Sequence, residues 1–317
     1  MNLFLWLVIA VLIIAAVLML TVYFTARYFF RFTILRKPTA TLENNINANT
    51  DWTKHIDFIK KRKEWLAEQS LEEIYISSVD ALKLHGTLVK CKESKKVVIC
   101  FHGYTSRGTS DFTALSKFYI EQGFNVIMVD QRAHGDSEGK YIGFGVLDRK
   151  DAEKWIEYVI DRFGSDVDIF LHGISMGGAT VLMTSGLKLP HNVRAIIADC
   201  AFTSAYDVFS HILKRDYHIP KFPIMNITEH MTKKNAGYGY NDVSTLKEVE
   251  KTKIPILFIH GEKDDFVPVW MSKKNYEVCN SEKEILIVKN ADHAESYFVN
   301  TLEYEKALKK YINKYTG

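Results

Sequence analysis

A serine lies at the centre of the pentapeptide Gly173-Ile174-Ser175-Met176-Gly177, between an apolar run and a helix-like stretch. The run VDIFLHG predicts a buried strand, and GATVLMTSGLKL predicts the helix that follows it. A strand, a tight turn with flanking glycines and a helix form the context of a nucleophile elbow. In that turn the serine projects above the sheet near a helix N-terminus, where positive partial charge favours an oxyanion. Ser175 is therefore the candidate nucleophile.

A serine hydroxyl is a poor nucleophile until a base takes its proton, and the chain offers 11 histidines for that task. His293 lies in NADHAE, just past the predicted strand EILIVKN and before the last predicted helix. This places it in a loop at the carboxyl edge of a sheet. His102, His134 and His260 also follow strands, but their positions suit the support of their own loops. We expect His293 to be the general base.

The base needs a carboxylate that holds its tautomer and stabilises the imidazolium. Asp264 follows the predicted strand PILFIHG in the segment HGEKDDFVP, again at a strand's carboxyl end, and is the expected acid. Asp265 is the adjacent alternative, and Asp199, at the end of VRAIIAD, is a weaker one. Asp292, beside the histidine, is expected at the surface.

A tetrahedral intermediate needs two backbone N–H groups around its oxyanion. One should come from Met176, directly after the nucleophile. The other should come from the loop FHGYTS after the strand KVVICF, and Tyr104 is the expected donor. With these parts, the chain would cleave an acyl compound through an acyl-enzyme.

Short apolar runs alternate with helical stretches from residue 73 onwards. EEIYISSV and LKLHGTLVK predict an antiparallel pair of strands. Further strands are predicted at 96–101, 125–130, 167–173, 193–199, 255–261 and 284–290, with helices near 111–122, 145–163, 176–187, 269–279 and 299–315. Strands this apolar must be covered on both sides. We therefore expect an α/β fold with a mixed, mostly parallel sheet and helices on both faces.

Residues 202–250 interrupt this alternation between VRAIIAD and PILFIHG, whose carboxyl ends carry the candidate site. Ligands bind at that edge of open α/β sheets. The segment is rich in apolar side chains such as Phe209, Phe222 and Met225, and we expect a small mobile lid that builds an acyl pocket. The alternative is that these side chains make only the core of the segment itself.

Residues 3–26 carry no charge, and about 20 apolar residues suffice to cross a bilayer as a helix. We expect an uncleaved transmembrane anchor over 1–30 rather than a signal peptide, because no basic residue precedes the run. Four basic residues follow the run: Arg27, Arg31, Arg36 and Lys37. By the positive-inside rule the hydrolase domain would lie on the cytoplasmic side of the cell membrane, in a single-pass protein.

Residues 31–72 are expected to form a linker and a juxtamembrane helix before a domain over 73–317. The Asn- and Thr-rich stretch 39–50 predicts a flexible linker. In 52–68, apolar residues at helical spacing accompany the basic run Lys60-Lys61-Arg62-Lys63. We expect this helix to cover the edge of the domain, the alternative being a helix on anionic lipid.

Charge and cysteine content exclude several functions. Lys and Arg total 41 against 38 Asp and Glu, so the net charge of +3 gives no reason to expect a nucleic-acid partner. The four cysteines fit no zinc or redox spacing, and Cys100 and Cys200 lie in apolar runs that predict buried free thiols. No motif for a metal, a nucleotide phosphate or a dinucleotide is present, and no cofactor is expected.

Six segments in order resemble the α/β-hydrolase superfamily over residues 73–315: FHGYTS, DQRAHGDSEG, HGISMGG, ADCAFTS, IHGEKDDFVP and NADHAESY. The chain order Ser175, Asp264, His293 is that of this superfamily. The chain looks most like membrane-associated bacterial hydrolases of the serine aminopeptidase/acyl-hydrolase type. In one departure, Ala133 stands in DQRAHGDS where glycine is usual in the family.

The resemblance implies hydrolysis without naming a substrate. We expect a carboxylester or thioester hydrolase whose partner is a small-molecule or lipid-like acyl substrate. One alternative is a serine peptidase on the same triad. Another is a catalytically silent membrane interaction module, although neither the serine, the histidine nor the elbow glycines are lost.

Overall fold

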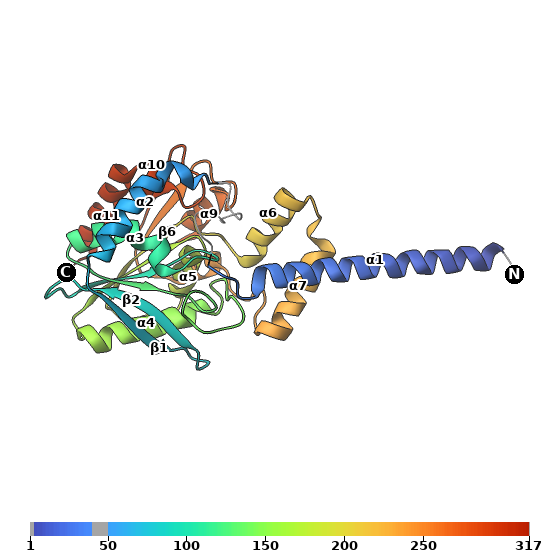
Figure 1. Cartoon of the computed structure of the whole chain (residues 1–317), viewed down its shortest axis with the longest axis horizontal. Coiled ribbons are helices and arrows are strands. Elements are labelled where there is room, and N and C mark those ends of the chain that lie inside the picture. Colours follow the sequence, from blue (N-terminus) through green and yellow to red (C-terminus); the bar gives the residue numbers. More distant parts are fainter. Residues whose placement is uncertain (1–2, 40–49, 317) are drawn as a thin grey trace.

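Within residues 3–39 and 50–316, which the computed structural model describes, eight strands form one sheet (Figure 1). The strands are β1 (Leu71–Ser77), β2 (Lys83–Val89), β3 (Lys96–Phe101), β4 (Asn125–Val129), β5 (Asp168–Ile174), β6 (Val193–Asp199), β7 (Ile256–Gly261) and β8 (Lys283–Val288). Their order is β1-β2-β4-β3-β5-β6-β7-β8. β2 pairs antiparallel with β1 and β4, and the other pairs are parallel. The predicted α/β fold with a mixed, mostly parallel sheet is confirmed.

The central strands are apolar throughout because both of their faces are buried. In β3, Val98 and Cys100 point into one core layer, whereas Val97 and Ile99 point into the other. This alternation follows from the two-residue period of a strand. The polar residues that follow these strands therefore lie together at the sheet's carboxyl edge.

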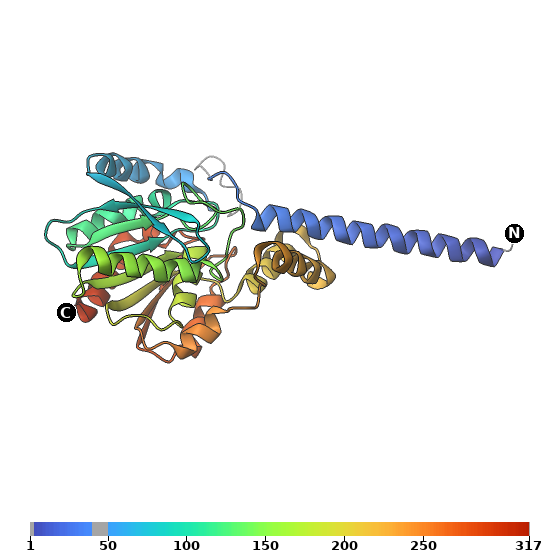
Figure 2. The same ribbon diagram turned by 90° about the horizontal axis from the view of Figure 1, so that it is seen from below.

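Helices cover both faces of the sheet (Figure 2). The first layer contains α2 (Ile56–Ala67), α3 (Gly108–Glu121) and α11 (Thr301–Tyr315), with the short α10 (Ser296–Val299) nearby. The second contains α4 (Asp148–Phe163), α5 (Met176–Thr184), α8 (Thr245–Lys251) and α9 (Trp270–Val278). In α11 the apolar stripe of Tyr304, Leu308, Tyr311 and Ile312 is buried, as its spacing of three and four residues requires.

The segment between β6 and β7 holds helices of two kinds. α6 (Ala205–Tyr217) and α7 (Lys221–Ala236) pack on each other beyond the carboxyl edge of the sheet, and we call this pair the lid helices (Figure 1). The side chain of Ser204 caps α6 by accepting a hydrogen bond from Asp207 N at 3.0 Å. α8, in contrast, packs against α5 and α9 in the flanking layer. The residues above the site are thus those of α6 and α7.

One long helix, α1 (Leu3–Ile34), projects from the molecule (Figures 1 and 2). It is long and apolar enough to cross a membrane, and its most apolar 18-residue window has no buried residue. The helix does not end near residue 30 but continues to Ile34. Its last turns, including Ala26, Phe29 and Phe30, are buried against the lid helix α7.

The chain leaving α1 is fastened to the loop after β4. Ile142 N donates to the carbonyl of Ile34 at 2.8 Å, and Arg36 N donates to that of Lys140 at 2.9 Å. The guanidinium of Arg36 donates to the carbonyls of Gly135 and Ser137, each at 2.5 Å. The end of α1 is therefore part of the folded domain. Of the linker predicted at 39–50, residues 40–49 lie outside the described residues.

The chain after this gap returns to the domain through a 3-10 helix, η1 (Trp52–His55), and α2. Thr50 Oγ1 donates to the carbonyl of His293 at 2.9 Å, and the Trp52 ring packs edge-on against Phe298 with centroids 5.3 Å apart. α2 buries Ile59 and lies on α3. The helix thus covers the domain, on the side of α10 and α11 and away from α1 (Figure 1).

Candidate active site

The turn around Ser175 has the strained geometry of a nucleophile elbow. Ser175 lies between β5 and α5 with φ 55° and ψ −113°, a conformation that costs a non-glycine residue free energy. A Cβ on Gly173 would lie 2.1 Å from the carbonyl oxygen of Gly177, and one on Gly177 would lie 1.9 Å from that of Phe101. Both distances are far shorter than a van der Waals contact between a Cβ and a backbone atom allows. The two glycines are therefore required at these positions.

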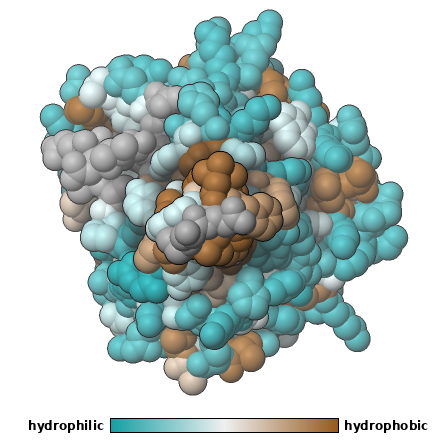
Figure 3. Space-filling model, turned by 90° about the vertical axis from the view of Figure 1, so that its right-hand side faces the viewer, coloured by the Kyte–Doolittle hydropathy of each residue, from teal (hydrophilic) through white to brown (hydrophobic). Residues whose placement is uncertain are grey.

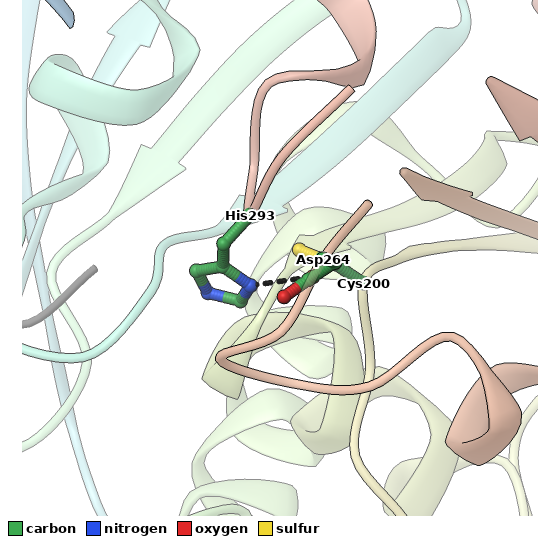
Figure 4. A group of neighbouring side chains, drawn as sticks. All are labelled: Cys200, Asp264 and His293. Atoms are coloured by element: carbon green, nitrogen blue, oxygen red, sulfur yellow. Dashed lines mark hydrogen bonds and ion pairs between the residues drawn. The ribbon is translucent and has the colours of Figure 1, made fainter. Parts of the chain in front are cut away.

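Ser175, His293 and Asp264 form one hydrogen-bonded chain. His293 Nε2 lies 2.8 Å from Ser175 Oγ, and His293 Nδ1 lies 2.7 Å from Asp264 Oδ2, as the dashed line in Figure 4 marks. Because a carboxylate only accepts, Nδ1–H donates to it and Nε2 is left to accept the serine proton. All three residues are buried. The structure thus brings together the three residues predicted from the sequence, in the order that proton transfer needs.

Asp264 is held as a carboxylate by four donors. Its Oδ1 accepts from Phe266 N at 3.0 Å and from Val267 N at 2.8 Å. Its Oδ2 accepts from His293 and lies 3.1 Å from His260 Nε2. Burial raises the pKa of this carboxyl, but the two imidazoles outweigh burial and hold the pKa well below its usual value of 3.8.

His260 is the residue of this group that sequence reasoning assigned only to its own turn. Its Nδ1 lies 2.7 Å from Ser272 Oγ, and its Nε2 lies 2.7 Å from the carbonyl of Val267 and 3.1 Å from Asp264. Both neighbours of His260 Nε2 are acceptors, so Nε2 carries the proton. Nδ1 therefore accepts a hydrogen bond from the Ser272 hydroxyl. His260 thus helps to hold the Asp264 carboxylate in position. No local sequence signal predicted this contact, because it depends on how the turn after β7 folds back.

The other carboxylates weighed as the acid lie elsewhere. The side chain of Asp265 is 62% exposed and pairs with Arg215 at 3.1 Å. Asp199 accepts a hydrogen bond from Tyr304 Oη at 2.9 Å, and burial raises its pKa to about 6. Asp292 has no hydrogen bond to His293 among the interactions of the described residues. Of these four carboxylates, Asp264 is the one that hydrogen-bonds the His293 ring.

Two backbone N–H groups near Ser175 have no acceptor among the described residues. Met176 N lies in the first turn of α5, where amides have no partner within the helix. The loop that carries Tyr104 lies directly beside the elbow, since a Cβ on Gly103 would be 3.5 Å from Ser175 Cβ. In the described ranges 3–39 and 50–316, neither Tyr104 N nor Met176 N donates a hydrogen bond. Both are available to an oxyanion.

Two histidines form hydrogen bonds that support the loop that carries Tyr104. Gln131 N donates to His102 Nε2 at 3.0 Å, and Thr105 N donates to His134 Nε2 at 3.2 Å. Burial lowers the pKa of His134 to about 3, so the ring is neutral and able to accept. Ala133, directly before His134, has a φ of 61°, a left-handed conformation that favours glycine. This explains why glycine is usual at this position in the family. Residues 131–134 thus support the loop that carries Tyr104.

A cysteine lies beside the acid. Sγ of Cys200, a carboxylate oxygen of Asp264 and a ring nitrogen of His293 all lie within 4.8 Å of one another (Figure 4). Burial raises the pKa of the Cys200 thiol well above its usual value, so sulfur stays protonated and is a poor metal ligand. The other two residues already bond each other. The arrangement fits acid–base chemistry better than metal binding.

An apolar cavity of about 160 Å³ opens above Ser175. Ser175 and Met176 line its base, and Phe209 of α6 and Met225 of α7 line its sides. Phe222, expected to line the same pocket, is instead 72% exposed at the start of α7. A cavity of this volume is large enough for a small apolar group, since a cavity of roughly 150 Å³ holds benzene.

A mostly parallel sheet with this strand order, carrying an elbow serine after β5 and a histidine after β8, defines an α/β hydrolase. The model of the prolyl oligopeptidase family (peptidase S9) matches residues 110–317, and the chain belongs to that family. It is 29% identical to protein YqkD of Bacillus subtilis (strain 168) over 238 residues, which cover 75% of this chain and 78% of YqkD.

Two solved structures share the fold. The esterase Pf2001 of Pyrococcus furiosus aligns with a TM-score of 0.67 at 20% identity, over 90% of this chain and 99% of the esterase. The acylaminoacyl peptidase of Pyrococcus horikoshii aligns with a TM-score of 0.57 at 18% identity, over 80% of this chain and 43% of the peptidase. The chain is thus a hydrolase of the esterase/peptidase S9 type.

Proposed function

We propose that the protein is a serine hydrolase that cleaves carboxylic esters or thioesters through an acyl-enzyme. The observation that carries this proposal is the buried chain from Asp264 through His293 to Ser175 at the base of an apolar cavity. Each member has the hydrogen-bond role that nucleophilic catalysis requires. The apolar walls suit an acyl chain.

In this mechanism Ser175 Oγ attacks the acyl carbonyl carbon while His293 Nε2 takes the hydroxyl proton. Asp264 stabilises the imidazolium, and the N–H groups of Tyr104 and Met176 donate to the oxyanion. Collapse of the intermediate breaks the bond to the alcohol or thiol, which leaves with the proton from His293. Water then attacks the acyl-serine with His293 as base, and a carboxylic acid is released.

The peptidase alternative would need a group that holds a substrate amine. Asp216 is the one carboxylate on the described cavity wall. Its two oxygens are already engaged, since they accept from Arg215 at 2.5 and 3.0 Å. This pairing favours an acyl substrate over a peptide amine.

A substrate panel on the full-length protein in detergent tests the proposal. Nitrophenyl esters, acyl-thioesters and aminoacyl anilides would be compared by the ratio of kcat/KM to the uncatalysed rate, because the leaving groups differ in reactivity. We expect esters or thioesters to show a ratio at least about 100-fold above the anilides. A larger ratio for anilides would establish the peptidase, and no turnover on any class would leave the silent module.

We further propose that α1 anchors the protein in the cell membrane with the hydrolase domain in the cytoplasm. The exposed, uncharged part of α1 and the exposed Arg27 and Arg31 behind it support this arrangement. α1 runs without interruption into the buried turn at Phe29. Cleavage of α1 as a signal sequence would therefore remove a residue that is buried in the folded domain.

Membrane fractionation and protease access test the anchor. We expect the protein to remain in the membrane pellet after carbonate washing, and protease added to spheroplasts to leave the domain intact until detergent is added. Release by carbonate would contradict the anchor. Digestion of intact spheroplasts would reverse the orientation.

A further inference from the structure

The end of α1 lines the cavity above the nucleophile. Phe29, Phe32 and Thr33 share this cavity with Ser175 and Met176, although more than 140 residues separate the two groups in the chain. A helix that served only to tether the domain would not need to line the site. The membrane-proximal helix is thus placed to contact whatever binds above the nucleophile.

Hydrogen bonds hold this part of α1 in one position relative to the oxyanion loop. Tyr104 Oη donates to the carbonyl of Phe32 at 2.9 Å, one of the last carbonyls of α1 that lack a helical partner. The ring of Phe29 packs edge-on against Tyr217 of α6 with centroids 4.8 Å apart. Together with the contacts of Ile34 and Arg36, these interactions fasten the end of α1 to α6 and to the loop that carries Tyr104.

The cavity lies close to the level at which the bilayer would end. Residues 3–26 span about 36 Å at ~1.5 Å per residue, enough for a hydrocarbon core of ~30 Å, and Arg27 is the first charge after them. On the same rise Phe29 lies only about 3 Å beyond Arg27, and Thr33 about 9 Å. The wall of the cavity therefore begins within two turns of the interface.

Viewed along α1 from its N-terminal end, apolar side chains gather at the projecting helix within a mostly hydrophilic surface (Figure 3), and the lid helices add exposed aromatic side chains. Phe222 is 72% exposed, and Tyr217 is 37% exposed beside Phe29. The α6–α7 connection between them lies on the side toward the N-terminus of α1 (Figure 1). Aromatic side chains in such a place suit the boundary between headgroups and acyl chains.

We propose that the last turns of α1 are a specificity-determining wall of the substrate site, and that an acyl chain reaches Ser175 from the bilayer along this helix. The substrate class is then a membrane amphiphile that places a single acyl chain in the cavity, with its ester at the elbow. This inference rests on the proposed hydrolase function and assigns α1 a role in binding.

Two matched threonines of α1 test the wall. Thr33 and Thr21 both donate to the carbonyl four residues earlier, but Thr33 lines the cavity whereas Thr21 is exposed on the membrane-spanning part. Thr33→Trp should fill the cavity and lower the dodecanoyl-to-acetyl ratio of kcat/KM at least about tenfold. Thr21→Trp should leave the ratio of the two substrates at the wild-type value.

A second variant guards against misfolding of Thr33→Trp. Phe29→Ala enlarges the cavity and should shift the preferred acyl chain to greater length. Equal dodecanoyl-to-acetyl ratios in Thr33→Trp, Thr21→Trp, Phe29→Ala and the wild type would overturn the role of α1. A small fluorophosphonate probe separates the two failures. If it labels every variant, the triad functions and only the inference about α1 fails, whereas an unlabelled wild type refutes the hydrolase proposal itself.

The route from the bilayer is tested with the full chain in phosphatidylcholine vesicles. A non-exchanging single-chain acyl ester is placed in the same vesicles as the protein or in separate vesicles. We expect hydrolysis only when both share a bilayer. Equal rates in the two arrangements would mean that substrate arrives through water, and the route along α1 would be wrong.

Discussion

Ser175→Ala is expected to lower kcat by about 10⁶-fold, the order measured when the serine of a Ser-His-Asp triad is removed. The loss is large because His293 Nε2 then has no hydroxyl to deprotonate and no acyl-enzyme forms. The oxyanion N–H groups remain, so a residual rate above that of water is expected. Labelling by a fluorophosphonate should disappear together with turnover.

The control for this prediction is Ser185→Ala. Ser185 is a second buried serine at the other end of α5, and its Oγ donates to the carbonyl of Leu182 at 2.7 Å. Its replacement should cost about 1 kcal/mol of stability and leave labelling and kcat nearly unchanged. Labelling that survives in Ser175→Ala would place the nucleophile elsewhere.

Asp264→Asn is expected to lower kcat by about 10⁴-fold while the fold is retained. An asparagine amide turned toward His293 donates instead of accepting, and so stabilises the tautomer that carries the proton on Nε2. That tautomer cannot take the serine proton. The matched control is Asp265→Asn, which removes an exposed pair with Arg215 and should change kcat less than about twofold. A damaging Asp265→Asn with a mild Asp264→Asn would exchange their roles.

The pKa of Asp264 adds a stability signature to the same pair of variants. Because its folded pKa lies well below 3.8, the carboxylate contributes stability above pH ~4 that is lost as pH falls through the folded pKa. Asp264→Asn should therefore have a lower Tm than the wild type at neutral pH. That difference should narrow as pH is lowered below about 4, as thermal denaturation across pH would measure. A constant difference would show that the ionised form is not preferentially stabilised.

The parts of the site that sequence reasoning found have local signals. The elbow is specified within five residues, since Gly173 and Gly177 are needed by backbone contacts that the turn itself creates. The strands are apolar runs of the right length, so the carboxyl edge on which Asp264 and His293 lie followed from the order of elements. Local pattern and parallel topology were sufficient there.

The parts that were missed depend on contacts between distant segments. Nothing near His260 indicates that its Nε2 faces Asp264, because this depends on how the turn after β7 folds back. The exposure of Phe222 and the separate packing of α8 likewise depend on which neighbour each helix meets. The burial of Phe29 at the end of an otherwise lipid-like helix is invisible in a hydropathy pattern, because the same residues suit lipid and protein equally.

The clamp of Arg36 on the carbonyls of Gly135 and Ser137 has a kinetic consequence. A flexible tether would let the domain tumble above a membrane and sample substrate from solution. In the proposed membrane arrangement, a junction fastened by Arg36 instead keeps the mouth of the cavity at one height and one tilt above the bilayer. For such an enzyme, the rate depends on the concentration of substrate within the bilayer, expressed as its mole fraction among the lipids, and not on its concentration in the bulk suspension. Diluting the substrate with inert lipid should then slow hydrolysis, whereas diluting the whole suspension with buffer should leave the rate per enzyme unchanged.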